Sequence, residues 1–447
     1  MQADAAPSLA ADRLFAVFDA VRRRLRRDET LLAALTGEDS SFVRFNRAKI
    51  RSAGHVSENE VTLDLIAGDR HACAASTLTG RPSEDELRLS TLLDGLRAVL
   101  AVADDDPHLN FATARHDTFE ESSSSLPPID AAVDTVLEAA AGADLVGVFA
   151  RGPIRRAFAA SSGQRNWFES DVFHLDVSLH GEGRTASKVS MGGKDWNGAD
   201  VAARIEDARQ KLALLQAAPY EPPPGRYAAY VAPRALEEVL RLLAWGGFGL
   251  EAHRTRQTPL LKMVSDGRAL HPSVTLRDDH AASLAATFTS RGFVKPDAVT
   301  LIEGGRYRDC LAEARSAKRY GVAVNAETEA PEALDLAGGE LGAAEAARLV
   351  GNGLFVSDIW YTNFSDRSDC RVTGVTRYAC FWVEAGRLAR PLAPMRFDAS
   401  LYHVLGDGLV GLTRERERLV DQHSYGGRSL ASMCLPGIVV DGLRLAS

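Results

Sequence analysis

The stretch RLLAWGGFGLEAHRTRQT, residues 241–258, completes an apolar helical pattern and then runs through a cluster of glycines. Apolar residues recur before and within it at helical spacing, which predicts an amphipathic helix with one buried face. They are Leu236, Val239, Leu240 and Leu243. Gly246, Gly247 and Gly249 follow, and such glycines end a helix or permit its local distortion. The segment therefore predicts a helix that packs on a core and is ended by its glycines.

Length and composition place this helix in a larger globular protein. The chain has 447 residues, too many for one ordinary core, so we expect two or three domains. Hydrophobic residues make up 45% and charged residues 25%, as in typical globular proteins. The formal net charge of -8 provides no general attraction to nucleic acid or anionic lipid. Neither is expected as a partner.

Targeting and cysteine patterns favour a cytoplasmic protein. Residues 1–7 show no basic-then-apolar signal pattern, and no stretch approaches about eighteen uninterrupted apolar residues. The five cysteines are scattered and form no Cys-x-x-Cys pair, which indicates free thiols rather than disulfides. We therefore expect a cytoplasmic location and no membrane anchor.

The periodicities on either side of the helix predict an α+β fold. Residues 1–218 combine helical stripes with antiparallel strand patterns, which predicts an N-terminal α/β-sandwich-like domain. One of its helices is predicted to begin with a capping box formed by Ser83 and Glu86. Prolines and Gly225 predict a linker at 219–225. Short apolar runs dominate residues 226–447, which predicts a β-rich C-terminal domain with a few helices.

Several segments, in this order along the chain, resemble those of the TldD/PmbA metallopeptidase family. The matching positions lie in an early strand pair, in a glycine turn between strands, after the helix of residues 241–258, and in a late strand hairpin. They are Phe45, Asn46, Lys49, Gly163, Gln164, Gly249, Leu250, Glu251, Thr373, Gly374, Glu384 and Gly386. The resemblance covers nearly the whole chain. It implies the family's α+β fold, with a β-rich C-terminal domain that contains the helix.

The resemblance also implies where a zinc site would stand. In the family's peptidase, a helix carries His-Glu, three residues and then His, followed by Gly-Leu-Glu. Counting back from Gly249 places Leu243 and Phe248 at the two histidines and Ala244 at the catalytic glutamate. Zinc needs nitrogen, sulfur or oxygen donors, and hydrolysis needs a carboxylate near the metal-bound water. The chain therefore resembles the PmbA (TldE)-like non-catalytic subunit, and we expect neither catalytic residues nor zinc in it.

Other groups offer weaker alternatives for chemistry. Glu251, His253 and His280 are candidates for a compensating metal site, although Glu251 and His253 would point about 200° apart on a helix. Ser187 beside Lys188 imitates a nucleophile pair, but it lacks the Gly-x-Ser-x-Gly context and is predicted to lie in a loop. Cys434 lies within a strand pattern, unlike the family's third zinc ligand, a cysteine.

Two functions from different classes follow from the resemblance. In the first, the chain joins a TldD-like zinc peptidase subunit as a heterodimer, and the pair encloses a chamber in which unstructured peptides are cut. In the second, it associates with itself and binds peptides without cleaving them. A third hypothesis is different chemistry on the same frame, which would depend on Glu251, His253 or His280. The first two need the same fold, so the sequence leaves both open.

Overall fold

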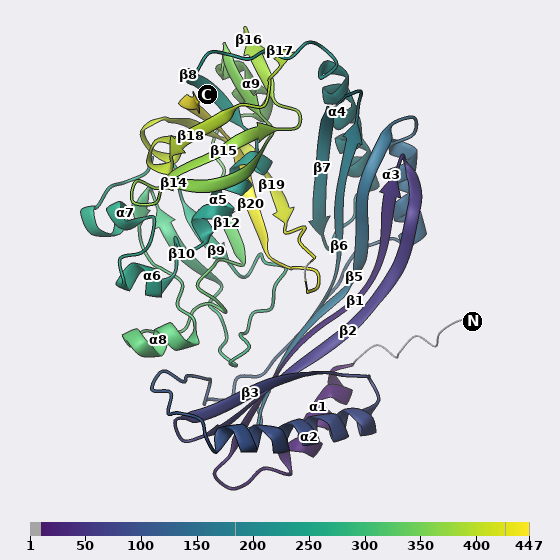
Figure 1. Ribbon diagram of the computed structural model, residues 1–447, viewed down its shortest axis with the longest axis vertical. Helices are drawn as coiled ribbons and strands as arrows, with labels where there is room; N and C mark the ends of the chain where they lie inside the picture. Colours follow the sequence, from purple (N-terminus) through teal and green to yellow (C-terminus); the bar gives the residue numbers. More distant parts are fainter. Residues whose placement is uncertain (1–9, 184, 425, 447) are drawn as a thin grey trace.

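The computed structural model describes residues 10–183, 185–424 and 426–446; residues 1–7, where no signal pattern was found, lie outside these ranges. Within the described residues, helices flank two sheets, and the predicted α+β fold is confirmed (Figure 1). None of the helices in this part of the chain combines the length and apolar character that a membrane span requires.

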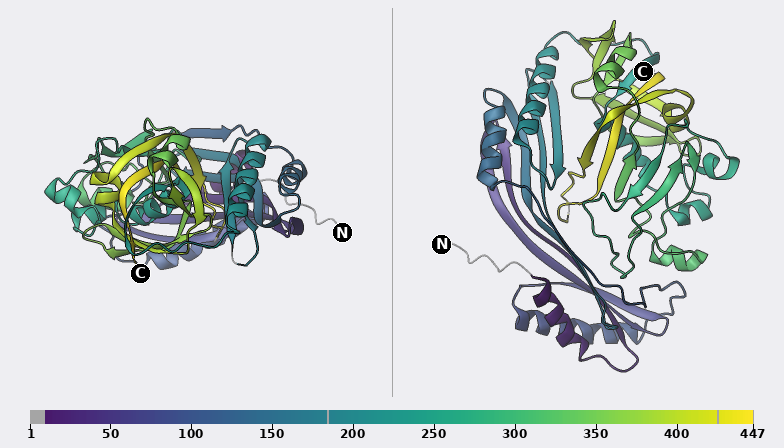
Figure 2. Two further views of the ribbon diagram at one scale, coloured as in Figure 1. Left: turned by 90° about the horizontal axis from the view of Figure 1, so that it is seen from above. Right: turned by 180° about the vertical axis from the view of Figure 1, so that it is seen from behind.

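The first sheet is built from the N-terminal half of the chain. Its strand order is β3-β2-β1-β5-β6-β4, and β7 pairs with β6 beyond the end of β4. Only β4 runs parallel to its neighbour. The longest strands curve along the whole length of the molecule (Figure 2). The strands are β1 (Thr30–Asn46), β2 (Lys49–Ala67), β3 (Arg70–Thr77), β4 (Thr118–Ser122), β5 (Asp144–Ala160), β6 (Arg165–His180) and β7 (Ala186–Gly193).

Alternation along β1 decides what each face of this sheet buries. Leu31 and Leu35 pack with α1 (Ala11–Arg22) and α2 (Pro82–Leu100), and Phe45, on the same face, packs with α3 (Ile129–Ala139) and α4 (Gly198–Leu214). Leu32 points to the opposite face and packs with Phe288 from the C-terminal half. Because both faces of the sheet are covered, the sequence of β1 begins with a nearly continuous apolar run, residues 31–35.

The start of α2 differs from the predicted capping box. The N-cap position is Arg81, and its side chain caps no backbone group. Instead the buried carboxylate of Asp85 accepts hydrogen bonds from the backbone amides of Thr79 at 2.7 Å and Gly80 at 3.0 Å. The capping box of Ser83 and Glu86 was therefore wrong, because Pro82 starts the helix and a carboxylate one turn later holds the preceding loop.

The second sheet is built from the C-terminal half. Its main path is β11-β10-β9-β12-β20-β8-β13-β16-β17, and four further strands join it through β20 and through one another. The long strand β20 pairs with β8, β12, β18 and β19, so it organises the sheet. The strands are β8 (Gly225–Val231), β9 (Leu276–Asp279), β10 (Ala298–Glu303), β11 (Arg306–Tyr307), β12 (Ala333–Leu336), β13 (Gly353–Val356), β14 (Asp358–Asp366), β15 (Arg371–Arg377), β16 (Phe381–Glu384), β17 (Arg387–Pro391), β18 (Arg396–Ser400), β19 (Leu409–Val420) and β20 (Ser432–Ala446).

Short helices surround this sheet, and one of them is central. The helix α5 packs between β14, β19 and β20 and contributes to the largest apolar core. A π-helical turn, η1 (His403–Asp407), precedes β19. The helices are α5 (Pro233–Ala244), α6 (Leu250–Arg254), α7 (Leu261–Asp266), α8 (Ala314–Tyr320) and α9 (Ala343–Leu349).

One buried arginine in the loop between β19 and β20 joins the two halves. The backbone amide of Arg428 donates to the Glu38 carboxylate at 2.6 Å, and its Nε donates to Ser40 Oγ at 2.8 Å. Its two terminal nitrogens donate to the carbonyls of Val172 at 2.8 Å and Gly152 at 2.6 Å. The guanidinium thus reaches three strands of the first sheet and fixes the C-terminal half against its inner face.

We expect Arg428→Ala to lower the free energy of unfolding by about 3–5 kcal/mol, because Ser40 and two carbonyls lose a buried donor and Glu38 loses its cationic partner. Urea unfolding followed by circular dichroism measures it. Arg414→Ala is the control, since Arg414 is exposed and only one of its side-chain nitrogens donates, to Glu340. A change within about 0.5 kcal/mol for both variants would contradict the role of Arg428.

Candidate functional site

The C-terminal end of α5 holds the positions where the zinc motif would stand. Leu243 and Ala244 form its last turn, and Phe248 follows four residues later. These side chains are only 1%, 8% and 1% exposed, and all three belong to the main core of the C-terminal half. They carry no atom that can bind a metal ion. The residues at these positions therefore do not fit zinc.

The chain reverses sharply between α5 and α6. Gly246 adopts a left-handed conformation with a φ of +78°, and a Cβ at Gly247 would lie 2.1 Å from the carbonyl oxygen of Leu243. Only glycines fit both positions without strain. The Gly247 carbonyl then accepts hydrogen bonds from His253 Nε2 at 2.7 Å and Thr258 Oγ1 at 2.9 Å. The glycines and His253 thus maintain a turn.

The hydrogen bonds of His253 occupy both ring nitrogens. Because Gly247 offers a carbonyl acceptor, Nε2 carries the proton, and Nδ1 accepts from the Tyr307 hydroxyl at 3.3 Å. Burial lowers the pKa of His253, which keeps the ring neutral. A neutral histidine with both nitrogens engaged has no lone pair left for a metal ion.

The other two metal candidates lie in separate contacts. Glu251 pairs with Arg319 at 2.8 Å on the surface. Buried His280 contacts Asp278 at 3.0 Å and the Pro296 carbonyl at 2.8 Å. Burial lowers the pKa of His280, but the hydrogen bond and the charge of Asp278 outweigh burial, so the pKa is raised overall. Within the described ranges, no group of three or more histidine, cysteine or acidic side chains is placed to hold a metal ion.

A cavity of about 850 Å³ adjoins α6. His253, Tyr307 and Cys310 line it together with apolar residues such as Leu250 and Val299. Its size is that of a small-molecule or peptide-end pocket. Burial raises the pKa of the Cys310 thiol, and Tyr307 hydrogen-bonds to both Cys310 and His253. The cysteine therefore stays protonated. The pocket has the properties of a binding site rather than of a catalytic site with a reactive thiolate.

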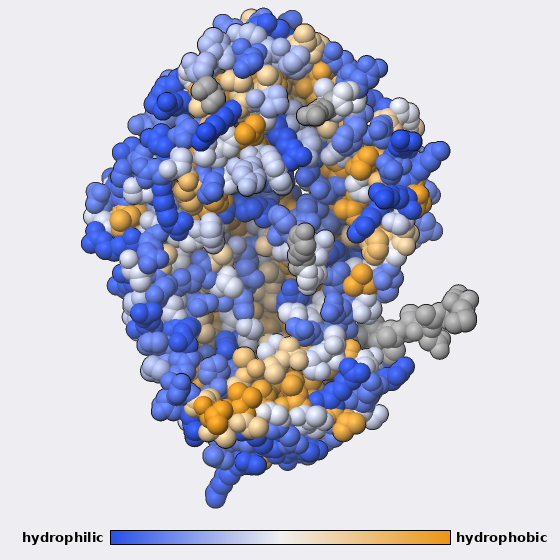
Figure 3. Space-filling view, in the orientation of Figure 1, coloured by the Kyte–Doolittle hydropathy of each residue, from blue (hydrophilic) through white to orange (hydrophobic). Residues whose placement is uncertain are grey.

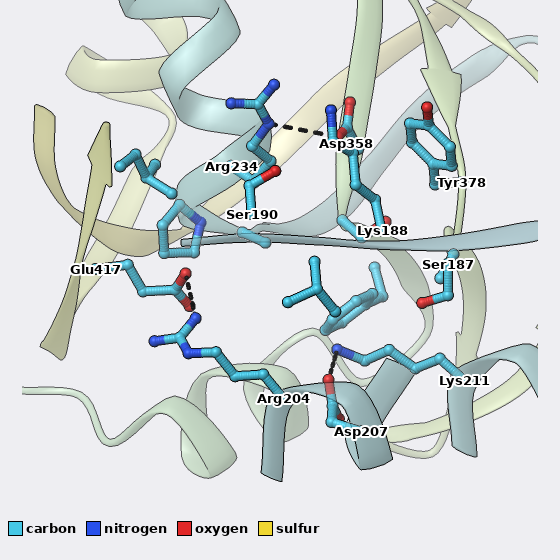
Figure 4. A pocket seen from close by; sticks show the side chains of 17 residues that line it. Ser187, Lys188, Ser190, Arg204, Asp207, Lys211, Arg234, Asp358, Tyr378 and Glu417 are labelled. Atoms are coloured by element: carbon cyan, nitrogen blue, oxygen red, sulfur yellow. Dashed lines mark hydrogen bonds and ion pairs between the residues drawn. The ribbon is translucent and has the colours of Figure 1, made fainter. Parts of the chain in front are cut away.

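A second cavity, of about 130 Å³, lies between the two halves of the chain (Figure 4). Strand β7 and helix α4 form one wall, and α5, β13, β14 and β19 form the other. Its volume is enough for several water molecules, a side chain or a carboxylate. Its labelled lining residues are Ser187, Lys188, Ser190, Arg204, Asp207, Lys211, Arg234, Asp358, Tyr378 and Glu417.

Ion pairs cross and line this interdomain cavity. Arg204 of α4 reaches Glu417 of β19 at 3.1 Å, and Lys211 pairs with Asp207 at 2.7 Å. Arg234 Nε lies 3.6 Å from the carboxylate of Asp358. Four cationic and three acidic side chains line the cavity, the cations are held in ion pairs, and its described lining contains no histidine to act as a base.

Sequence reasoning missed most of this cavity. Its lining comes from segments that are far apart in the chain, and each segment alone carries ordinary charged residues. Ser187 and Lys188 were predicted to lie in a loop, but both belong to strand β7, so that prediction was wrong. Strand alternation in ASKVSMGG was the available signal, because it places Lys188 and Ser190 on the same face.

The buried carboxylate of Asp358 makes the stability of this region depend on pH. Burial raises its pKa to about 7, although Arg234, Lys188 and Arg377 lower it. The negative charge of Glu238 also raises the pKa of Asp358. Between about pH 4 and 7 the unfolded chain releases this proton while the folded chain keeps it. The contribution of Asp358 to stability therefore declines as pH rises through this range.

We expect Asp358→Asn to gain stability relative to the wild type as pH rises from about 4 to about 7, with an upper slope of about 1.4 kcal/mol per pH unit. Urea titrations at several pH values measure it. Asp105→Asn is the control, because that side chain is 80% exposed. A difference between Asp358→Asn and the wild type that stays constant across this range would contradict the raised pKa.

Comparison with known proteins assigns this architecture. Residues 224–447 match the family model described as the PmbA/TldA metallopeptidase C-terminal domain. No curated protein matches the chain at a significant level. The matched residues include α5, both glycine positions of the turn after it and the whole second sheet.

Solved structures share the fold at low sequence identity. TldE from Thermococcus kodakarensis aligns with a TM-score of 0.76 and 14% identity, covering 97% of this chain and 100% of that one. Proteins described as modulators of DNA gyrase from Thermotoga maritima and Bacteroides thetaiotaomicron both align with a TM-score of 0.74, at 12% and 16% identity. They cover 97% and 98% of this chain and 99% and 98% of their own. The family predicted from sequence is confirmed: the chain belongs to the TldD/PmbA family.

Proposed function

We propose that this chain is the non-catalytic, PmbA (TldE)-like subunit of a cytoplasmic zinc metallopeptidase complex that cuts unstructured peptides. The observation that carries the proposal is the replacement of both histidines and the glutamate of the zinc motif by Leu243, Phe248 and Ala244, all packed in the core. The fold shared with a protein named TldE supports it. A TldD-like partner would supply the zinc.

The packing of α5 explains why this subunit would not carry out hydrolysis. Replacing Leu243 or Phe248 by histidine would place a polar ring among apolar neighbours, which costs free energy unless a metal or hydrogen bond compensates. No carboxylate replaces Ala244, and His253 is engaged in the turn. The part left for this chain is to shape the chamber and bind peptide ends through cavities such as the one beside α6.

A second candidate is a self-associating peptide-binding protein without peptidase activity. The cavity of about 850 Å³ favours it, because this chain builds that pocket without a partner. The two candidates differ in whether a relative with His-Glu-x-x-x-His is needed. A neighbouring reading frame that encodes such a relative would favour the peptidase pair, and its absence would favour the stand-alone binder.

We expect the chain to hydrolyse no unstructured peptide on its own, even with added zinc, because its motif positions lack donors. Co-expressed with a His-Glu-x-x-x-His relative, it should co-purify, with about one zinc per pair and with hydrolysis that a chelator abolishes. Peptide cleavage followed by mass spectrometry and metal analysis measures both. Robust, chelator-sensitive activity of the chain alone would overturn the proposal.

A matched variant tests whether Glu251 belongs to a hidden metal site. Glu251→Gln should leave the zinc content and the activity of the pair within about twofold, because the Glu251 carboxylate lies at the surface and pairs with Arg319. Arg319→Gln removes the same pair from the other side and serves as its control. A loss of zinc with Glu251→Gln but not with Arg319→Gln would assign a metal to this chain.

A further inference from the structure

A third cavity, of about 200 Å³, lies between the first sheet and loops of the C-terminal half. Strands β1 and β5 contribute Thr36 and Arg156, which pair across the two strands. The loops that complete the wall contain residues 285–290, 327–332 and 429–431. Figure 3 shows that the surface is hollowed between the C-terminal half and the hydrophobic lower end of the molecule. We call this space the Arg156 cavity.

Arg156 brings a positive charge to this cavity without an ion pair. Among the described residues, its one hydrogen-bond partner is the Arg155 carbonyl, which accepts from Nη1 at 2.8 Å. No carboxylate in the described part of the chain lies within 4.0 Å of its guanidinium. Burial lowers the pKa of Arg156 and outweighs the charges of Glu332, Glu327 and Glu38, which raise it. The guanidinium is thus partly desolvated and keeps free donors that line the cavity.

Glu327 brings a negative charge to the same cavity, and within the described ranges no cationic nitrogen lies within 4.0 Å of it. Its carboxylate accepts from the backbone amide of Ser290 at 2.7 Å and from Ser290 Oγ at 2.6 Å. A carboxylate has about four acceptor sites, so Glu327 can accept further hydrogen bonds. The other acidic residue of the lining, Glu332, already pairs with buried Lys295. One cation and one anion of the lining therefore remain without a counter-ion. They are close enough for Glu327 to raise the pKa of Arg156, yet they do not touch.

Small and apolar side chains provide most of the remaining lining. Buried Ala285, Ala286, Phe288 and Leu430 are among them. An apolar cavity of about 150 Å³ admits benzene, a molecule of six carbon atoms. The Arg156 cavity, at about 200 Å³, therefore has room for a ligand of about six to nine non-hydrogen atoms. This is the size range of the amino acids from alanine to leucine.

We propose that the Arg156 cavity binds a free α-amino acid with a small apolar side chain, its carboxylate on Arg156 and its ammonium on Glu327. A planar guanidinium can donate two parallel hydrogen bonds to one carboxylate. The zwitterion carries its two opposite charges on one carbon atom, so it fits between a cation and an anion that are near but not in contact. Each charge of the lining then gains a counter-ion, and the alanines and Phe288 surround the apolar side chain.

Other ligands of this size satisfy only one of the two charges. A simple carboxylate leaves Glu327 without a cation, and a simple amine leaves Arg156 without an anion. The C-terminal residue of a peptide likewise offers a carboxylate but no ammonium on the same carbon atom. This site goes beyond the proposed function, because it lies within one chain and needs neither zinc nor a partner. Only the source of the ligand rests on that function, since peptide hydrolysis is a reaction that can release free amino acids.

Isothermal titration calorimetry of the purified full chain at pH 7 tests the site with L-valine and two smaller analogues. The first, 3-methylbutanoate, lacks the ammonium of valine, and the second, 2-methylpropylamine, lacks its carboxylate. We expect saturable binding of L-valine and at least about tenfold weaker binding of both analogues, because each leaves one charge of the cavity unpaired. Neither analogue is larger than valine, so a weaker affinity cannot come from a steric clash.

Variants assign the binding to this cavity. Arg156→Gln and Glu327→Gln should each weaken L-valine binding at least about tenfold. Ala286→Leu keeps both charges but fills part of the cavity, so it should weaken binding as well. Arg44→Gln, at an exposed position of β1, is the control and should bind L-valine like the wild type. Circular dichroism checks that each variant is folded.

Three results would each refute the amino-acid site. They are no saturable binding of L-valine by the folded wild type, binding of either analogue as tight as that of L-valine, and L-valine binding that Arg156→Gln or Glu327→Gln leaves unchanged. The titration contains no zinc and no partner subunit. Its outcome is therefore independent of whether this chain and a zinc-bearing relative together cut peptides.

Discussion

The buried guanidinium of Arg428 is a charged contact between the two halves, beside the apolar cluster of Leu32 and Phe288. The Arg428 side chain donates to Ser40 Oγ on β1 and to the backbone carbonyls of Gly152 on β5 and Val172 on β6. A buried charge of this kind is tolerated only because Glu38 lies 3.7 Å from its Nε and because its donors are used. The interdomain cavity, with its Arg204 to Glu417 pair, lies between the same two halves.

The two cavities divide the possible roles of the chain. The interdomain cavity is small and lined by ion pairs, whereas the cavity beside α6 is large and half apolar. The cavity beside α6 places no nucleophile next to an available base, since the Cys310 thiol is kept protonated by burial and His253 is held by Gly247. Both suit binding. This supports a subunit that holds substrate while chemistry takes place elsewhere.

Periodicity predicted the elements better than it predicted the sites. The helix that carries Leu236 and Leu243 was predicted because its apolar stripe has the helical period, and α5 spans Pro233–Ala244. The charged cavity was not, because Lys188, Arg234 and Glu417 come together only through the packing of two sheets. The missing zinc donors could be predicted, since a ligand motif is local. The function of His253 could not, because its partner Tyr307 lies 54 residues away.

The turn after α5 explains how a frame can remain when its chemistry is absent. The glycines there could have been needed to bring two histidines onto one ion, yet Gly246 and Gly247 are required by the reversal itself, whatever stands at positions 243 and 248. Leu243 and Phe248 then add core area where polar ligands would have required a compensating ion. The glycine pattern therefore indicates the fold, and only the residues at the metal-binding positions indicate whether catalysis is possible. In this chain the glycine turn is present and the metal-binding side chains are not, and the apolar core stabilises α5 without a metal ion.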